Sequence, residues 1–570
     1  MAAGWVTLPS AVAPLLKGPV ENEDSFGPKS SMTRWVLALV GVLVVTTSAS
    51  AWWMWTNGFF CRPPAAEAAL FRLYALDFLE PLESEGAGGF LRQLHSHRSP
   101  RGPLLAGVGA LIAHLGGGLT PVVLWVTTTF FGILFLVGTW RLALGFVPPR
   151  AALAVTTIVA FSPAVMTMSR VFRPQIAAAA LTVWALAALS RSRLLTSRRH
   201  AVALGAFTAL ATLGKVMAPI YVVGGVAAAL LAAQLQPEEV RKASRRGAVI
   251  SLLVFLAVCG WWLLPNLEAV LEYTAQASRG VRPWDMPAAP SRWEVERWTW
   301  YGIGFVNNAQ GFLVAAVAGL VIPFVLRGRR GSGRARFAAD GSGWILLVAV
   351  VTGYVALTLG HLGSAGKFSM TFVPLVTLAA MAGLRRIRWA FVRGVAAVLL
   401  AVAALTTGVL GHRPFSDPVT LVRWHSFQVL SGGDTHVSAP ARWLGLSPSS
   451  TGEEWPIREF VRTIAAESSS AGRPLRVLTP HQYINFPNLL YAARCLGVHG
   501  TIAEGDWNAV REKRLLEAVR STDLLVLDTA VLDWDRSRKA LLAHSVRLDV
   551  LVETRVTSKS VVRLVRVVDP

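Results

Sequence analysis

The sequence predicts a polytopic, all-α membrane domain with about eleven transmembrane helices, followed by a small extracytoplasmic α/β domain. Three observations support this fold class. Hydrophobic residues make up 53% of the 570 residues and charged residues only 15%, and average soluble proteins carry more charge. After about residue 453, strand-like and helix-like stretches alternate. Before that point the apolar residues form uncharged blocks, each long enough or nearly long enough to cross a bilayer as a helix, including 36–55, 122–140, 151–169 and 247–264.

The positive charge is distributed as in a membrane protein. The net charge is +22, and such a basic chain often binds nucleic acid. Here, however, arginines gather in short loops between the apolar blocks, for example at 190–199 and 327–336, which is typical of cytoplasmic loops. We therefore expect no nucleic-acid partner, and we expect these basic loops to lie inside the cell.

The chain begins with a polar segment, residues 1–33, that lacks the apolar core and small-residue cleavage site of a signal peptide. We interpret it as a cytoplasmic tail. The membrane domain is expected over residues 34–411, and its first helix, 34–55, serves as an uncleaved anchor. A long outer loop follows, to about residue 120. Helices are then expected at 121–140, 151–169 and 176–189.

The apolar segment 201–235 is too long for one crossing, and Lys215 interrupts it. We predict two short helices that turn outside at Gly214 and Lys215. Basic loops separate most of the remaining helices, which places the N-terminus inside and the last ~160 residues outside. These helices are expected at 247–264, 311–326, 344–360, 370–384 and 395–410.

One apolar segment, residues 103–117, is too short for a confident crossing. If it crossed the membrane, every later loop would change sides, and the basic loops would be exported. We therefore expect an interfacial or re-entrant helix there.

The C-terminal part is expected to be a linker over 412–452, rich in Pro, Gly and Ser, and a soluble domain over 453–570. The apolar runs 475–479 and 523–528 read as buried strands. The last stretch, 550–568, alternates as a hairpin does. Helices are expected at 485–497 and 508–519.

Candidate general bases lie in the loop after the first helix. At helical spacing, Glu67, Phe71, Tyr74 and Asp77 fall near one face of a helix that suits the membrane surface. A carboxylate there could take a proton from an acceptor hydroxyl or amine. The alternative is that these acidic residues only solvate a loop.

Four cations are expected at the outer ends of helices: Arg170, Arg173, Lys215 and Lys367. Charges near the membrane are costly and are commonly functional, and together these four could hold the phosphate of a lipid-linked donor. The alternative is that each side chain reaches out to lipid headgroups.

The loop 268–310 combines aromatic and acidic residues, including Trp284, Asp285 and Trp298. Such surfaces suit the faces and hydroxyls of sugars, and they also suit the aromatic belt of a membrane interface. His95 and His97 could bind a metal, but the sequence offers no obvious third ligand, so no metal site is assigned.

Several stretches in this order resemble the glycosyltransferase-C fold of the protein O-mannosyltransferase and aminoarabinose transferase superfamily. The resemblance covers about residues 34–410 and extends loosely to the C-terminal domain. The stretches are AAEAALFRLYALDF, HSHRSPRGPLLAG, FSPAVMTMSRVFRPQIAAAALTVWALAAL, ALGAFTALATLGKVMAPIYVV, WWLLPNL and HLGSAGKFSMTFVPLVTLAAMAGL.

The sequence departs from the family pattern at three places. The family's Asp-Glu pair is Ala66 and Glu67 here, so the usual catalytic Asp is missing. No carboxylate stands near Arg173, where the family has a second acidic residue, and its Arg-Tyr before the tenth helix is replaced, which leaves Lys367. The base is thus either Glu67 or Asp77, or the chain has lost activity.

The resemblance implies a membrane glycosyltransferase that moves a sugar from a polyprenyl-phosphate donor to a glycan, lipid or protein acceptor outside the bacterial cytoplasmic membrane. No cofactor is expected, because the lipid-linked sugar is a substrate, and a divalent metal has no support in the sequence. Membrane lipids are the other expected partners. Two alternatives are a non-catalytic relative that acts in envelope assembly and a lipid or sugar transporter.

Overall fold

The structure is a computed structural model, and it describes most of the membrane domain and part of the C-terminal domain. The N-terminal tail and the predicted helix 508–519 fall almost wholly outside the described residues. The residues that the structure describes are 29–56, 66–279, 312–322, 342–360, 369–411, 419–424, 427–431, 457–479, 486–498, 500–504, 522–528, 547–555 and 561–568, with a few single residues near 294–306 and 519.

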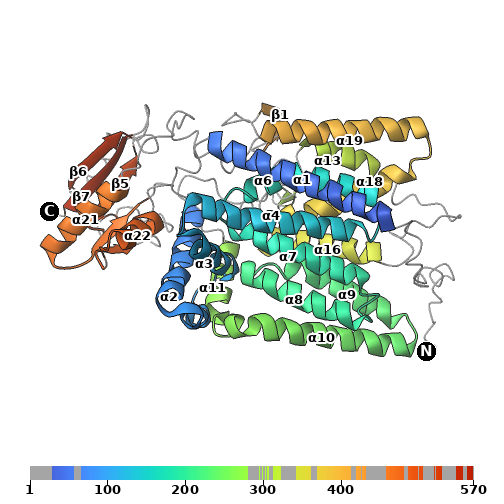
Figure 1. Cartoon of the computed structure of the whole chain (residues 1–570), viewed down its shortest axis with the longest axis horizontal. Coiled ribbons are helices and arrows are strands. Elements are labelled where there is room, and N and C mark those ends of the chain that lie inside the picture. The colour runs from blue at the N-terminus through green and yellow to red at the C-terminus, as the bar shows by residue number, and fades with distance from the viewer. Residues whose placement is uncertain are drawn as a thin grey trace.

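Helices make up the larger body of the molecule, and most of them lie along its long axis (Figure 1). Every transmembrane segment expected from the sequence contains helix. The elements are α1 (Lys29–Thr56), α4 (Pro121–Ala143), α5 (Pro149–Ala160), α6 (Pro163–Met168), α7 (Pro174–Arg191), α8 (Arg198–Gly214), α9 (Ile220–Gln234), α10 (Glu238–Leu263), α13 (Phe312–Val321), α16 (Ser342–Gly360), a short 3₁₀ turn (Met370–Phe372) with α18 (Val373–Arg386), and α19 (Ala390–Gly411).

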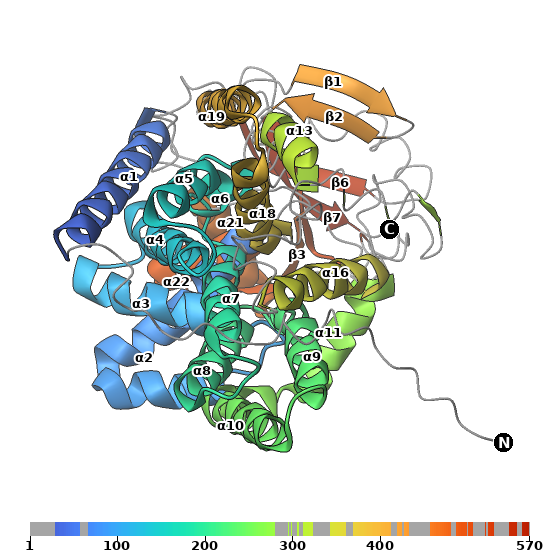
Figure 2. The ribbon, with the colours of Figure 1, turned by 90° about the vertical axis from the view of Figure 1, so that its right-hand side faces the viewer.

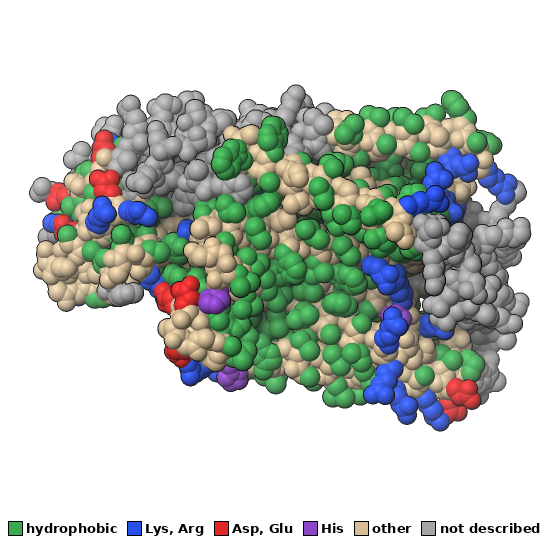
Figure 3. Space-filling model, in the orientation of Figure 1, with side chains coloured by type: hydrophobic (Ala, Val, Ile, Leu, Met, Phe, Trp, Pro, Cys, Tyr) green, Lys and Arg blue, Asp and Glu red, His purple; other side chains and the backbone are tan. Residues whose placement is uncertain are grey.

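The helix α7 is the centre of the bundle (Figure 2). Nearly all of its side chains are buried, and α4 and α8 are its main neighbours. The outer helices instead present apolar side chains outward, such as Val44 on α1 and Leu252 on α10. Exposed apolar surface of this extent suits lipid rather than water. Figure 3 shows the resulting broad hydrophobic surface along the bundle.

Five of the described helices are long and apolar enough to span a membrane by length and composition. They are α1, α4, α10, α16 and α19. The other segments of the bundle are built from shorter helices, including α5 and α9. The chain is therefore a multi-pass membrane protein, with the mostly helical architecture that the sequence predicted.

Some boundaries differ from the expectation. The predicted helix 151–169 is divided into α5 and α6, because Pro163 lacks the N–H that a continuous helix needs. The basic stretch 240–246, expected as a loop, forms part of α10, whose first turn contains Glu238 and Glu239. Acidic side chains stabilise the positive end of a helix.

Three helices close one end of the bundle: α2 (Ala66–Ser96), α3 (Leu104–Gly116) and α11 (Leu267–Arg279). The segment 103–117 thus contains a short helix that packs beside α2, so the expected helix is present, and its interfacial or re-entrant position stays a prediction. The helix α2 bends at Gly86, whose φ of 69° favours glycine. α11 occupies the start of the segment that was expected to be a Trp-rich loop.

The C-terminal domain contains a five-stranded mixed sheet. The order is β4 (Ile502–Glu504), β3 (Leu475–Leu478), β5 (Leu524–Asp528), β7 (Val561–Val568) and β6 (Arg547–Arg555). β3 is parallel to β4 and β5, whereas β7 is antiparallel to β5 and β6. The predicted strands, the hairpin and the helix at 485–497 are confirmed.

Two helices, α21 (Ile457–Ala471) and α22 (Phe486–Cys495), share the apolar core of this domain, in which Phe460, Leu489 and Val526 are fully buried. The predicted linker 412–452 contains an antiparallel pair, β1 (Val419–Trp424) and β2 (Phe427–Ser431).

Candidate active site

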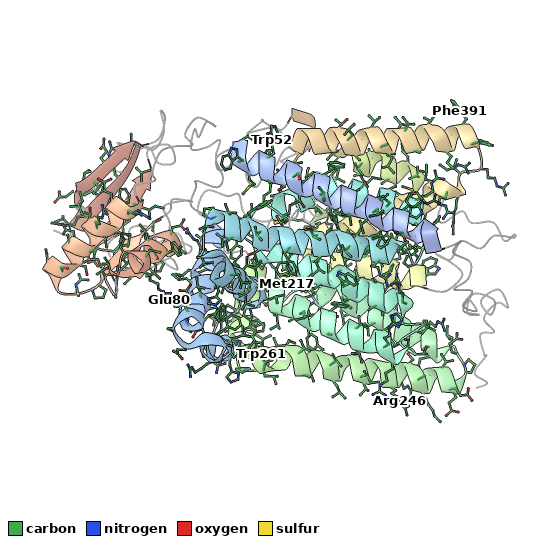
Figure 4. All side chains as sticks on the ribbon, in the orientation of Figure 1. Trp52, Glu80, Met217, Arg246, Trp261 and Phe391 are labelled. Atoms are coloured by element: carbon green, nitrogen blue, oxygen red, sulfur yellow. The ribbon has the colours of Figure 1, made fainter. Side chains whose placement is uncertain are left out.

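The candidate site lies at the end of the bundle that faces the C-terminal domain. Figure 4 places Glu80, Met217 and Trp261 at this end and Arg246 at the opposite end. The helix α2 lies across this end. Its inner face is the series Ala68, Phe71, Ala75 and Phe78, all buried in the core of the bundle. Such a spacing of three and four residues is that of a helix with one apolar face.

Glu67 lies in the first turn of α2, and its side chain is outside the described residues. The next two residues, Ala68 and Ala69, are each 1% exposed, so the helix is packed against the bundle from its start. The helix is continuous from Glu67 to Asp77, since its only break is at Gly86. Ten residues of helix separate the two carboxylates by about 15 Å, so they belong to different places.

Asp77 contacts the C-terminal domain. Its Oδ1 accepts a hydrogen bond from Nη1 of Arg494 on α22, at 2.5 Å, and a carboxylate oxygen of Glu80 lies 3.9 Å from the same nitrogen. The side chains of Asp77 and Arg494 are 24% and 28% exposed. The structure therefore gives Asp77 a structural partner in the other domain.

A second contact between the domains lies one helical turn away. The guanidinium of Arg72 stacks on the ring of Tyr491, 3.6 Å from its centre, and its Nη2 donates to the carbonyl oxygen of Leu119. Burial lowers the pKa of Arg72, although Tyr491 opposes this, and burial raises the pKa of Tyr491. α2 and α22 are thus joined by a cation–π contact and an ion pair.

The segment between α2 and α3 is held from two sides. The His97 ring is buried against Tyr74 and Phe78, with ring centres 5.1 and 5.2 Å away. Asn266, between α10 and α11, accepts from the backbone N–H of Ser99 and donates to the carbonyl of His97. Burial lowers the pKa of His97, and nearby Asp77 partly opposes that shift.

This segment also contacts the end of α8. A Cβ atom on Gly102 would overlap the carbonyl oxygen of Leu213, so only glycine allows this approach. Gly214 approaches α7 less closely, since a Cβ added there would be 3.2 Å from the backbone nitrogen of Ala178. Lys215 follows as the first residue beyond α8, which confirms the predicted turn.

Arg173 is the residue that precedes α7, five positions before Ala178. Ala178 lies beside Gly214, the last residue of α8, and Lys215 follows directly. Along the axis of α7, Arg173 is therefore about 7 Å of helix rise from the end of α8. The neighbouring Phe172 packs under α3, because a Cβ on Gly109 would lie 2.8 Å from its ring. Arg173 and Lys215 thus belong to the same end of the bundle, beneath α2 and α3.

Arg170 has a different environment. Its guanidinium stacks on Trp53 of α1, 4.2 Å from the ring centre, and the residue is 4% exposed. It lines a groove between α1, α4 and the α5–α6 segment. In Figure 2, α1 and α8 lie on different sides of α4 and α7, so Arg170 is on the α1 side of the bundle.

The remaining candidate residues give less information. Lys367, Trp284 and Asp285 lie outside the described residues. The carbonyl oxygen of Trp298 accepts a hydrogen bond from the Tyr354 hydroxyl on α16.

Sequence reasoning did not identify Arg494, Tyr491 or Asn266. Arg494 and Asp77 are 417 positions apart, and Asn266 and His97 are 169 apart. No local pattern could have paired them. The one available signal was the polar Asn266 within the apolar stretch WWLLPNL, since a polar group there requires hydrogen-bond partners.

No family model and no curated protein sequence matches this chain. Two solved structures of ArnT from Cupriavidus metallidurans match it over nearly their whole length. The apo structure gives a TM-score of 0.51 at 14% identity, covering 94% of this chain and 98% of ArnT. The structure bound to undecaprenyl phosphate gives 0.52 at 13% identity, covering 93% and 98%.

The oligosaccharyltransferase of Archaeoglobus fulgidus gives a TM-score of 0.47 at 12% identity, covering 86% of this chain and 69% of its own. This value is too low to carry an argument. The two ArnT structures suffice for the architecture, since they match both the membrane domain and the C-terminal domain. The fold of this chain is the glycosyltransferase-C fold, which it shares with ArnT.

Proposed function

We propose that this protein is a membrane glycosyltransferase that moves a sugar from a polyprenyl-phosphate donor to an acceptor at the outer surface of the cytoplasmic membrane. One observation supports the proposal: α2, which carries Glu67 in its first turn, lies over the end of the bundle to which Arg173 and Lys215 belong. A carboxylate and two cations at a membrane surface are the groups that such a transfer requires.

The chemistry assigns a separate role to each group. The acceptor oxygen or nitrogen forms a bond to the anomeric carbon of the sugar, while the bond from that carbon to the phosphate oxygen breaks. The carboxylate of Glu67 takes the proton of the acceptor. The polyprenyl phosphate leaves with the bonding electrons, and Lys215 and Arg173 stabilise its added negative charge.

The comparison with ArnT supports a donor of this kind. One of the two ArnT structures contains undecaprenyl phosphate, and its fold is the fold of this chain. A lipid donor also explains why the cations lie at the ends of membrane helices rather than in the C-terminal domain. The identity of the sugar depends on side chains that a likeness at 13% identity does not define.

Asp77 is not assigned as the base. It is about 15 Å along the helix from Glu67 and is paired with Arg494. A general base must be negatively charged and within reach of the proton of the acceptor. The Asp77 carboxylate is instead paired with the guanidinium of Arg494 in the other domain. Asp77 therefore has a structural role in the proposal.

The test uses membranes that contain the full chain and a polyprenyl-phosphate donor with a labelled sugar. Glu67→Gln should lower the transfer rate on the order of a hundredfold or more, because it removes a general base. The matched control is Glu83→Gln, an exposed carboxylate further along α2, which should transfer at the rate of the unmodified protein. Lys215→Gln should weaken the binding of undecaprenyl phosphate.

Two results would count against the proposal. Full activity in Glu67→Gln together with loss in Asp77→Asn would move the base to Asp77. If the unmodified protein binds the lipid and transfers no sugar from any donor supplied, the non-catalytic role in envelope assembly becomes the better assignment.

A further inference from the structure

The loop 97–103, which joins α2 to α3, is packed against the helix that carries the proposed base. The Ser99 hydroxyl donates a hydrogen bond to the Tyr74 hydroxyl on α2 at 3.3 Å, and it accepts one from the backbone N–H of Arg101. Tyr74 is seven residues after Glu67 on the continuous part of α2. The loop therefore contacts α2 about 10 Å of helix rise from the proposed base.

The same loop is packed against the end of α8. A Cβ atom added to Gly102 would overlap the carbonyl group of Leu213. Leu213 is two residues before Lys215, which is the first residue beyond α8. The main chains of the loop and of α8 are thus in direct contact, and a displaced loop must displace either α2 or the end of α8.

Asn266 holds this loop from a third side. It lies between α10 and α11 and is 3% exposed. Its Oδ1 accepts a hydrogen bond from the backbone N–H of Ser99 at 3.0 Å. Its Nδ2 donates to the carbonyl oxygens of His97, at 3.3 Å, and Trp262, at 2.8 Å. One carboxamide, with an acceptor and two donors, therefore ties two backbone groups of the loop to the end of α10.

The position of Asn266 favours this long-range role over a local one. It is the residue before α11, where an asparagine side chain commonly accepts hydrogen bonds from the first amides of its own helix. Among the hydrogen bonds of the described residues, Oδ1 of Asn266 instead accepts from Ser99, 167 positions away. The side chain thus holds the loop rather than the first turn of α11.

We propose that Asn266 is a positioning residue of the transfer site: it holds the loop 97–103 in place, and the loop fixes α2 relative to the end of α8. The inference rests on the proposed function, because it treats Glu67 and Lys215 as groups of one site. The transition state needs the base and the phosphate-binding cation at the same time, whereas donor binding needs the cation alone. Loss of Asn266 should therefore lower kcat more than it raises the KM for the donor.

The first measurement needs no substrate. Hydrogen–deuterium exchange of the full-length protein in detergent, followed by mass spectrometry, compares the unmodified protein with Asn266→Ala. The substitution leaves one buried N–H and two carbonyl groups without their partner. Exchange should rise on the order of tenfold in the loop and also at the end of α8, because the two are packed together. A rise confined to the loop and the α10–α11 junction would mean that Asn266 stabilises only its own surroundings, and the proposal would be wrong.

The second measurement is transfer of a labelled sugar from a polyprenyl-phosphate donor in membranes. Asn266→Ala should lower kcat on the order of tenfold or more and change the KM for the donor by less than about threefold, since a small misplacement of reacting groups slows the chemical step. Gly102→Ala disturbs the same loop from the side of α8 and should have a similar effect. The two substitutions together should lower kcat by less than the product of their single effects, because both act through one loop.

The matched control is Gly88→Ala, near the bend of α2, where an added Cβ meets nothing within 4 Å. It should show the exchange pattern and the kcat of the unmodified protein. A higher KM with unchanged kcat in Asn266→Ala, or fully multiplicative effects in the double variant, would overturn the positioning role. If Gly102→Ala fails to fold, exchange at the end of α8 and the division between kcat and KM in Asn266→Ala still decide. If the unmodified protein transfers no sugar, the proposed function fails, and the exchange measurement still shows whether Asn266 couples α2 to α8.

Discussion

Asp77 and Arg494 form an ion pair whose energy can be isolated experimentally. Both side chains are partly exposed, so solvent screens the attraction, and pairs of this kind contribute up to about 1 kcal/mol. A double-mutant cycle with Asp77→Asn and Arg494→Gln should give a coupling energy of about that size in thermal unfolding. Independent effects of the two substitutions would show that the contact contributes nothing to docking.

His97 is expected to make stability depend on pH. Burial lowers its pKa in the folded state, so the unfolded chain binds the proton more readily. Its contribution is therefore fully present above the unfolded pKa of about 6.5 and is lost as the pH falls toward the lower folded value. Melting temperatures of the unmodified protein and of His97→Phe, compared between pH 8 and about pH 5, should differ in slope. Equal slopes would mean that another group causes the acid sensitivity.

For single residues, the sequence predicted which elements carry the candidate side chains better than it predicted which side chains they contact. It placed Glu67 and Asp77 on a surface helix, and the helix is present. It grouped Arg170 with Lys215, but a stack on Trp53 directs Arg170 toward α1. The direction of a side chain at a helix end depends on its tertiary neighbours, and Trp53 is distant in the sequence, so the pattern of charges alone could not separate the two places.

Close contacts at glycine hold pairs of helices together in the bundle. A Cβ on Gly205 of α8 would overlap backbone atoms of Ser251 on α10, and one on Gly224 of α9 would overlap the Thr352 side chain on α16. Small residues allow membrane helices to approach closely, which increases their packing contacts. These contacts fix the α8–α9 hairpin, and with it the position of Lys215.

Gly205→Val should therefore destabilise the membrane domain. Overpacking of a close contact costs about 1–3 kcal/mol, and the shift of α8 should also weaken binding of undecaprenyl phosphate near Lys215. Gly41→Val on α1 is the control, because nothing lies within 4 Å of an added Cβ there. Thermal unfolding in detergent measures both variants. Equal melting temperatures would show that α8 and α10 can separate without cost.

The helices themselves could be predicted because long apolar blocks must be helical in a membrane. Their interruptions could be predicted less well. Pro163 ends a helix inside an apolar block, and the basic residues 240–246 continue one, so hydropathy alone misplaced both boundaries. The same limit applies to α11, because the composition of a Trp-rich segment does not distinguish a helix from a loop.

In the whole molecule, the C-terminal domain is held on α2 and therefore lies at the same end as the candidate site. Nothing in the sequence predicted this docking, since the contacts of Arg72 and Asp77 with α22 join segments over 400 residues apart. If Glu67 is the base, as proposed, the C-terminal domain is docked on the same helix that carries this carboxylate and could restrict which acceptors approach it.

The two ends of the bundle differ in charge, and this difference predicts the orientation in the membrane. Lys and Arg side chains gather at the end opposite the C-terminal domain (Figure 3), where Arg246 lies. Because cytoplasmic loops are enriched in these residues, that end should be inside and the C-terminal domain outside. A reporter that is active only outside the cytoplasm should thus be active when fused after Pro570 and inactive when fused after Arg199. Activity after Arg199 without activity after Pro570 would invert the molecule and move the candidate site to the cytoplasmic face. The donor would then bind from the cytoplasmic side, and the proposal that the acceptor site faces the outside of the membrane would be wrong.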